Sequence, residues 1–87
     1  MEFKKIKIKD IEGKDVEIEF DYKGLANYIF SKTADIGELE LARELYKNGK
    51  IDVDKDIAHK LKEYIKSAFG PLVQESIIPT LDKIINN

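Results

Sequence analysis

Residues 5–19 read KIKIKDIEGKDVEIE, and this stretch decides how the chain folds. Apolar and charged residues alternate on both sides of Gly13, which is the period of half-buried β-strands. The charged residues then fall on one face and the apolar residues on the other. The apolar face holds Ile6, Ile8, Val16, Ile18 and Phe20. The pattern predicts an antiparallel β-hairpin over residues 2–21.

The register of this hairpin follows because opposed residues in an antiparallel pair point to the same side. A two-residue turn at Glu12 and Gly13 would set Ile8 against Glu17 and mix the faces. A three-residue loop, Ile11 to Gly13, instead opposes apolar to apolar and Lys to acid, and makes Gly13 the left-handed residue of a G1 bulge. The predicted pairs are Lys5 with Glu19, Ile6 with Ile18, Lys7 with Glu17, Ile8 with Val16 and Lys9 with Asp15.

After the hairpin, apolar residues recur at helical spacing. The predicted helices span about 22–33, 36–48, 55–69 and 71–85. Asp21, Asp35 and Asp54 are the predicted N-caps, and Glu38 completes a capping box with Asp35. Pro79 should kink or split the last helix, because it removes a backbone donor. A short third strand at 50–53 is a further possibility, since Ile51 and Val53 share a face.

The apolar stripes also predict the core. Phe30 in the first helix, and Ile36 and Tyr46 in the second, fall on the predicted core faces. Two aromatic residues fall outside these stripes: Phe3 lies on the charged face of the hairpin, and Tyr28 lies beside the stripe of the first helix. We therefore expect an α+β fold, with the hairpin packed on three to four helices in a single domain, 1–87.

Composition excludes several classes of protein. The 87 residues hold 15 Lys and Arg, 17 Asp and Glu and no Cys, so disulfide frameworks and thiolate metal sites are excluded. The near-neutral charge gives no general attraction to nucleic acid or to anionic membranes. The sequence has neither a membrane-spanning run nor an export signal, and we expect a cytoplasmic protein without a membrane partner.

Few side chains offer chemistry. His59 is the single histidine and lies on a charged helix face without a partner acid or nucleophile. Asp52, Asp54 and Glu63 have the spacing of an EF-hand loop, but Ile57 stands where the turn needs Gly. Which acids pair in space stays open. We expect no enzyme and no catalytic, cofactor-binding or metal-ligating residue.

Binding surfaces are better candidates. The last helix is apolar around more of its circumference than one small core requires, so self-association or partner binding is predicted there. The predicted partner-binding residues are Leu81, Ile84 and Ile85, followed by Phe3 and Ile11 on the outer face of the hairpin. The alternative is nucleic-acid binding by the lysine-rich face of the third helix, formed by Lys55, Lys60, Lys62 and Lys66.

A hairpin with a Gly-containing turn runs into DYKGLANYIFSKTADIGELELARELYKNG, residues 21–49. The most recognisable part is Asp35-Ile36-Gly37-Glu38 followed by Leu41-Ala42-Arg43. This organisation resembles small proteins of uncharacterised activity carried by bacterial prophages and mobile elements. The resemblance implies an accessory protein that acts by binding, and it transfers no site residue. Together with the inventory above, it predicts a non-enzymatic protein-binding or assembly module.

Overall fold

The computed structural model describes all residues, 1–87, and opens with an antiparallel hairpin. Strand β1 spans Lys5–Lys9 and strand β2 spans Asp15–Glu19. All five cross-strand pairs are those predicted. Gly13 has a φ of 81°, and its amide donates to the Asp10 carbonyl at 3.0 Å. The three-residue loop with a glycine bulge is therefore confirmed.

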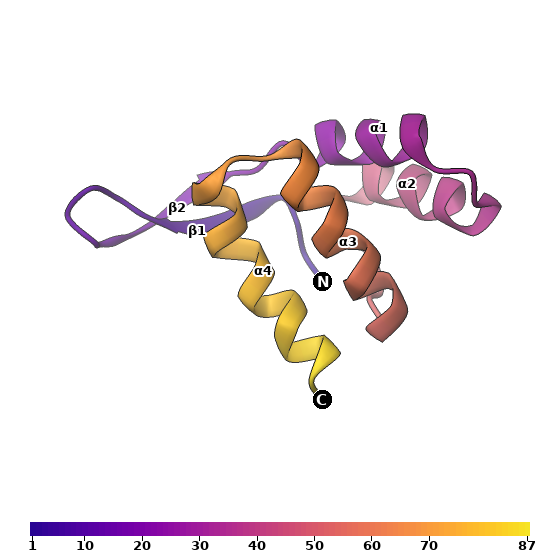
Figure 1. Ribbon diagram of the computed structural model, residues 1–87. Coiled ribbons are helices and arrows are strands. Elements are labelled where there is room, and N and C mark those ends of the chain that lie inside the picture. Colours follow the sequence, from indigo (N-terminus) through magenta and orange to yellow (C-terminus); the bar gives the residue numbers. More distant parts are fainter.

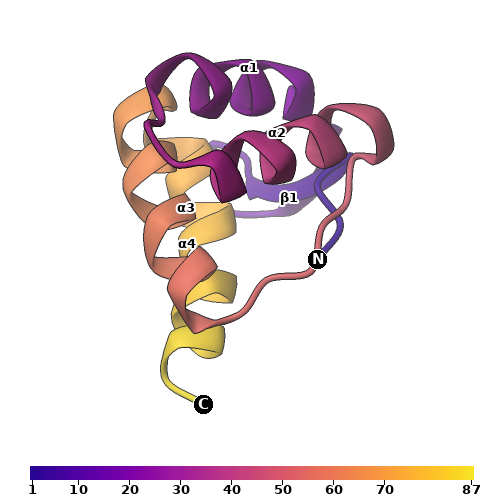
Figure 2. The same cartoon turned by 90° about the vertical axis from the view of Figure 1, so that its right-hand side faces the viewer.

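Four helices follow and form two packed pairs: α1, Tyr22–Lys32, packs on α2, Ile36–Asn48, and α3, Lys55–Ala68, packs on α4, Pro71–Ile85. Helix α3 also contacts α1, and α4 contacts β1 (Figure 1). Figure 2 shows the α1–α2 pair lying across one end of the α3–α4 pair. The predicted α+β fold is confirmed. No helix combines the length and the apolar character needed to cross a lipid bilayer.

The helix ends are set by short-range hydrogen bonds. Carboxylates of Asp21, Asp35 and Asp54 accept from amides inside the first turns of α1, α2 and α3, at 2.9, 2.7 and 2.8 Å. These residues satisfy donors that would otherwise have no partner, as predicted. Gly49 ends α2 in the left-handed conformation, with a φ of 69°. Pro79 lies within α4 without splitting it, because the helix is continuous from Pro71 to Ile85.

The alternation of exposed and buried side chains in β1 does not continue into residues 1–4. The amide of Phe3 donates to the Gly49 carbonyl at 2.7 Å, and the amide of Ile51 donates to the Met1 carbonyl at 3.1 Å. The chain bends at Lys4, so the alternation of β1 does not extend to Phe3, which is fully buried. The prediction that Phe3 lies on an exposed outer face is therefore wrong. Residues 50–53 form a single bridge to residue 2 and no strand.

The core lies where the two helix pairs meet the base of the hairpin. Its fully buried large side chains are Phe3, Leu25, Ile29, Leu45, Leu61, Ile65 and Leu81. The far half of the hairpin projects beyond the helices (Figure 1). Ile11 in its loop is fully exposed, and Val16 is 38% exposed although it belongs to the apolar face. The hairpin therefore contributes Ile6 and Phe20 to the buried core, and Ile8 and Ile18 pack against it.

Candidate functional site

A groove runs along the outer face of the α1–α2 pair, on the side away from α3. Its volume is about 250 Å³. On α1 the spacing of Lys23, Asn27 and Phe30 places all three along one margin of the helix. Arg43 and its neighbours on α2 form the opposite wall. We call this surface the α1–α2 groove, and its lining residues are Ala26, Asn27, Phe30, Ala42, Arg43, Tyr46 and Lys47.

Two aromatic rings in the groove contradict the predicted core. Phe30 is 45% exposed and Tyr46 is 44% exposed, although both were assigned to core faces, and Ile36 is 77% exposed. The reason is the side from which α3 approaches. Tyr28, on the other margin of α1, packs edge-on against Tyr64 of α3 at 6.0 Å between ring centroids. Helix α3 therefore covers the margin with Tyr28 and leaves the margin with Phe30 open.

Cations stand over both exposed rings. The guanidinium carbon of Arg43 lies 5.3 Å from the centroid of Phe30, and the Lys23 ammonium lies 5.1 Å from that of Tyr46. Such cation–π contacts hold a long side chain over an aromatic face. Lys47 adds a third positive charge, while Glu40 is paired with Arg43 at 2.6 Å. The groove is thus apolar and aromatic inside and mainly positive at its rim.

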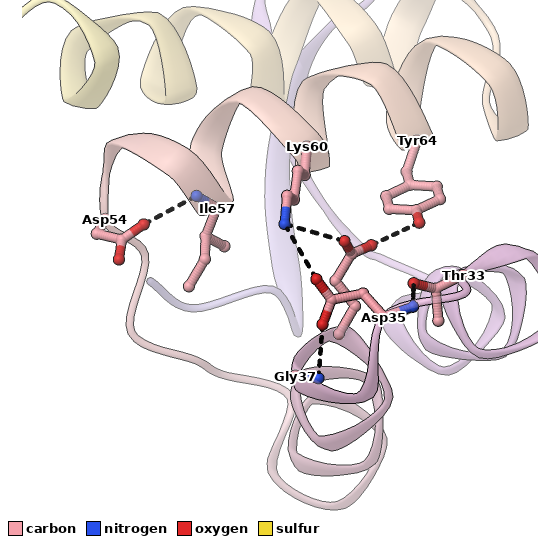
Figure 3. A network of polar contacts seen from close by, with 8 residues as sticks. Thr33, Asp35, Gly37, Asp54, Ile57, Lys60 and Tyr64 are labelled. Atoms are coloured by element: carbon pink, nitrogen blue, oxygen red, sulfur yellow. Dashed lines mark hydrogen bonds and ion pairs between the residues drawn. The ribbon is translucent and has the colours of Figure 1, made fainter.

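The inner face of the same helix pair is tied to α3 by a polar network (Figure 3). The Tyr64 hydroxyl donates to the Glu38 carboxylate at 2.6 Å. The Lys60 ammonium lies 3.1 Å from Glu38 and 3.7 Å from Asp35. The predicted capping box is wrong in its second half: the Asp35 amide donates to Thr33 Oγ1 at 3.0 Å, and Glu38 turns to α3 instead.

This network shifts the acidity of its members. The hydrogen bond from Tyr64, followed by contact with Lys60, holds the pKa of Glu38 below its usual value despite partial burial. Burial and the bond to Glu38 raise the pKa of the Tyr64 phenol. The pKa of Lys60 is raised, chiefly by its hydrogen bond to Glu38. All three shifts favour the ionised pair of Glu38 and Lys60 and the neutral phenol of Tyr64, and these contacts link α2 to α3.

The residues predicted to bind a partner do not form one surface. Leu81 is fully buried in the core, so its assignment to a docking surface is wrong. Ile84 and Ile85 are half-buried and pack against the core. Ile11 is fully exposed, but it lies at the hairpin tip, remote from the C-terminal end of α4 (Figure 1).

The lysine face of α3 is partly occupied by acids. Lys60 contacts Glu38 and Asp35, and Lys62 donates to Asp82 of α4 at 2.7 Å. Lys55 and Lys66 are exposed. Ion pairs reduce the positive charge available for phosphate groups. Nucleic-acid binding by this face therefore stays a prediction, without a geometric feature that favours it.

The remaining polar groups lie at the surface. All buried side chains are apolar, and His59 is exposed. The structure contains no group of three or more His, Asp or Glu side chains that could hold a metal ion. In comparisons with known proteins, no family model, curated protein or solved structure matches the chain.

Proposed function

We propose that the chain is a non-enzymatic protein-binding module whose docking surface is the α1–α2 groove. The observation that carries this proposal is the pair of half-exposed rings, Phe30 and Tyr46, each held under a cation in an apolar groove. Aromatic residues and Arg are enriched in protein interfaces and dominate their binding energy. The proposal includes an accessory role in a prophage or mobile element, and the support for that role is the sequence resemblance of residues 35–43.

The occupant that fits this groove is an amphipathic helix with apolar anchors and an acidic flank. A groove between two helices accepts a third helix through anchors at spacing i, i+3, i+4 and i+7. Lys23, Arg43 and Lys47 outnumber Glu40, the acid paired with Arg43, along the rim, whereas the whole chain has a net charge of -2. This local reversal of sign favours carboxylates beside the anchors and disfavours a basic helix.

The experiment is a titration of isotope-labelled protein, followed by two-dimensional amide NMR. The probe is a synthetic amphipathic peptide of about 15 residues, long enough to form a helix, with Leu and Phe anchors and Glu elsewhere. We expect shifts centred on Asn27, Phe30 and Arg43. Phe30→Ala and Arg43→Glu should each weaken binding at least about tenfold, as for anchor residues of an interface.

Two controls make the titration specific. Ile36→Ala removes a more exposed apolar side chain from the same helix pair, outside the groove, and should leave the affinity unchanged. The same peptide with Lys in place of Glu should bind weakly. Equal binding of the two peptides, or shifts confined to α4, would contradict the proposed docking surface.

A further inference from the structure

The hairpin has two edges, one on β1 and one on β2, and they differ in how far the helices cover them. Helix α4 packs against β1 and lies toward the β1 side of the sheet (Figure 1). The backbone of strand β2, Asp15–Glu19, lies beside β1 and close to the backbone of no other helix or strand. Proteins usually cover or blunt an unpaired strand edge, because its free amides and carbonyls can pair with another chain. Here one edge is shielded and the other is open.

The open edge has identifiable backbone groups. The Phe20 amide donates to the Lys4 carbonyl and the Asp10 amide donates to the Lys14 carbonyl, both at 2.9 Å, which fixes the two ends of the ladder. Hydrogen-bonded pairs alternate along an antiparallel ladder, so Ile18 and Val16 direct their backbone groups toward β1. The residues between and beside them direct theirs outward. These residues are Asp15, Glu17 and Glu19.

The side chains of this edge are sorted by face. The three carboxylates lie on one face, and on the other face Val16 is 38% exposed and Ile18 is half-buried. Asp15 is paired with Lys9 at 2.7 Å and Glu17 lies 3.9 Å from Lys5, but both acidic side chains are more than half exposed. Exposed pairs of this kind contribute little to stability and exchange partners readily.

This charge pattern selects the strand that can be added. Antiparallel pairing of two β2 edges would set Glu17 against Glu17 and Asp15 against Glu19, which like-charge repulsion disfavours. An added strand with basic residues on one face would place a cation opposite each of the three acids of β2. Its apolar residues on the other face would extend the apolar face that contains Val16. Strand β1, which reads KIKIK, already makes this pairing on the other side of β2.

We infer that the β2 edge is a second interaction surface, which accepts an extended segment of a partner protein with alternating basic and apolar residues. The segment adds as a third, antiparallel strand. Its main-chain hydrogen bonds to the outward groups of Asp15, Glu17 and Glu19 supply affinity, and its cations supply selectivity. This surface is separate from the α1–α2 groove and does not depend on it.

The test uses the full chain, isotope-labelled, with the blocked peptide Ac-KVKVKVK-NH2 as the probe and Ac-EVEVEVE-NH2 as its control. We expect the lysine peptide to slow hydrogen exchange of the outward amides of β2 at least about tenfold, because they become hydrogen-bonded. Exchange at Val16 and Ile18, whose amides already face β1, should change little. The glutamate peptide should leave exchange at all of these amides unchanged.

Two substitutions separate backbone pairing from simple charge attraction. Glu17→Pro removes an outward donor without removing a ladder bond, and should abolish the protection. Lys7→Pro removes the equivalent donor on the shielded edge and should leave peptide binding intact. If either proline variant unfolds, Glu17→Lys combined with Glu19→Lys keeps every donor and should transfer the protection to the glutamate peptide.

Three results would overturn the inference. They are shifts without slowed exchange at the outward amides of β2, protection of the β1 edge instead, and equal effects of the lysine and glutamate peptides. Each of these would show that the peptide is attracted to the surface without being added to the sheet.

Discussion

The two faces of the α1–α2 pair both carry aromatic residues and cations, but the inner face is covered by α3 and the outer face is exposed. On the inner face, Tyr28 of α1 packs on Tyr64 of α3, and Tyr64 and Lys60 of α3 both contact Glu38 of α2. On the outer face, Phe30 and Tyr46 lie under cations and half of each ring remains exposed. An aromatic residue beside a cation therefore does not identify a binding surface by itself. What distinguishes the outer face is that no element covers it.

The inner face of the α1–α2 pair contributes to the stability of the fold, whereas the outer face carries the proposed binding surface. The inner network and the core below it bind the helix pairs to one another, whereas the half-exposed groove side chains Phe30 and Tyr46 lie outside the core. Substitutions on the two faces should therefore differ in what they change. Inner substitutions should mainly lower the free energy of unfolding, and substitutions of the exposed groove side chains should mainly lower the affinity for a partner.

The largest expected effect is on the core side of α1. Ile29 is fully buried and adjoins Phe30 in the sequence. Ile29→Ala should lower the free energy of unfolding by about 2–5 kcal/mol, because it removes buried methylene and methyl groups and leaves a cavity. Urea denaturation followed by circular dichroism measures this loss. A loss below about 1 kcal/mol would contradict the assignment of Ile29 to a well-packed core.

The next largest effect is expected in the polar network on the inner face. Tyr64→Phe removes the hydroxyl that donates to Glu38 and keeps the ring that packs on Tyr28. We expect a loss of about 1–2 kcal/mol, because the bond is to a charged and largely buried carboxylate. The matched control is Tyr28→Phe, which alters the other ring of the pair and should change stability by less than about 0.5 kcal/mol. Equal effects of the two substitutions would show that the hydroxyl bond is unimportant.

The same bond predicts a dependence on pH. The folded pKa of Glu38 is below its ordinary value of 4.5, so the folded chain binds fewer protons there than the unfolded chain. The stability that Glu38 contributes is complete above the unfolded pKa and is lost as the pH falls through the folded pKa. Because Tyr64 is the main cause of the shift, Tyr64→Phe should lose less stability than the wild type over this acid range. Denaturant titrations at several acid pH values measure the free energy of unfolding of both proteins. An equal loss of stability with falling pH in Tyr64→Phe and in the wild type would contradict this prediction.

The smallest expected effect on stability is in the groove. Phe30→Ala should lower the free energy of unfolding by less than about 1 kcal/mol, since nearly half of the ring is exposed and Ala is a better helix former. It should nevertheless weaken binding of the acidic helical probe. Thermal denaturation and the NMR titration together measure both quantities. A loss of stability comparable to that of Ile29→Ala would make Phe30 a core residue and remove the basis for the docking surface.

Much of the architecture was predictable because it depends on short-range chemistry. The period of two, the single glycine and the opposite charges of the two strands allow only one sensible register, and the structure has that register. The three aspartate caps and the helix bounds follow from local hydrogen bonding in the same way. Of the two predicted effects of Pro79, a kink or a split, the split does not occur, since α4 runs through that residue.

The candidate site was not predictable, and the errors have one cause. Phe30 and Tyr28 lie on opposite margins of the apolar stripe of α1, and helical spacing does not say which margin a later helix will cover. The burial of Phe3 depends on a bend at Lys4 and on pairing with Gly49, which is 46 positions away in the sequence. Glu38 satisfies the spacing of a capping box, but Tyr64 offers a partner that sequence distance conceals.

The sequence by itself determined the local elements of this protein, including the hairpin register, the caps, the four helices and the absence of any thiol chemistry. These features depend on residues within a few positions of each other or on composition. Only the tertiary structure decided which apolar and charged residues remain available to a partner. Availability depends on the directions in which packed elements approach, and those directions result from the whole core rather than from any local period.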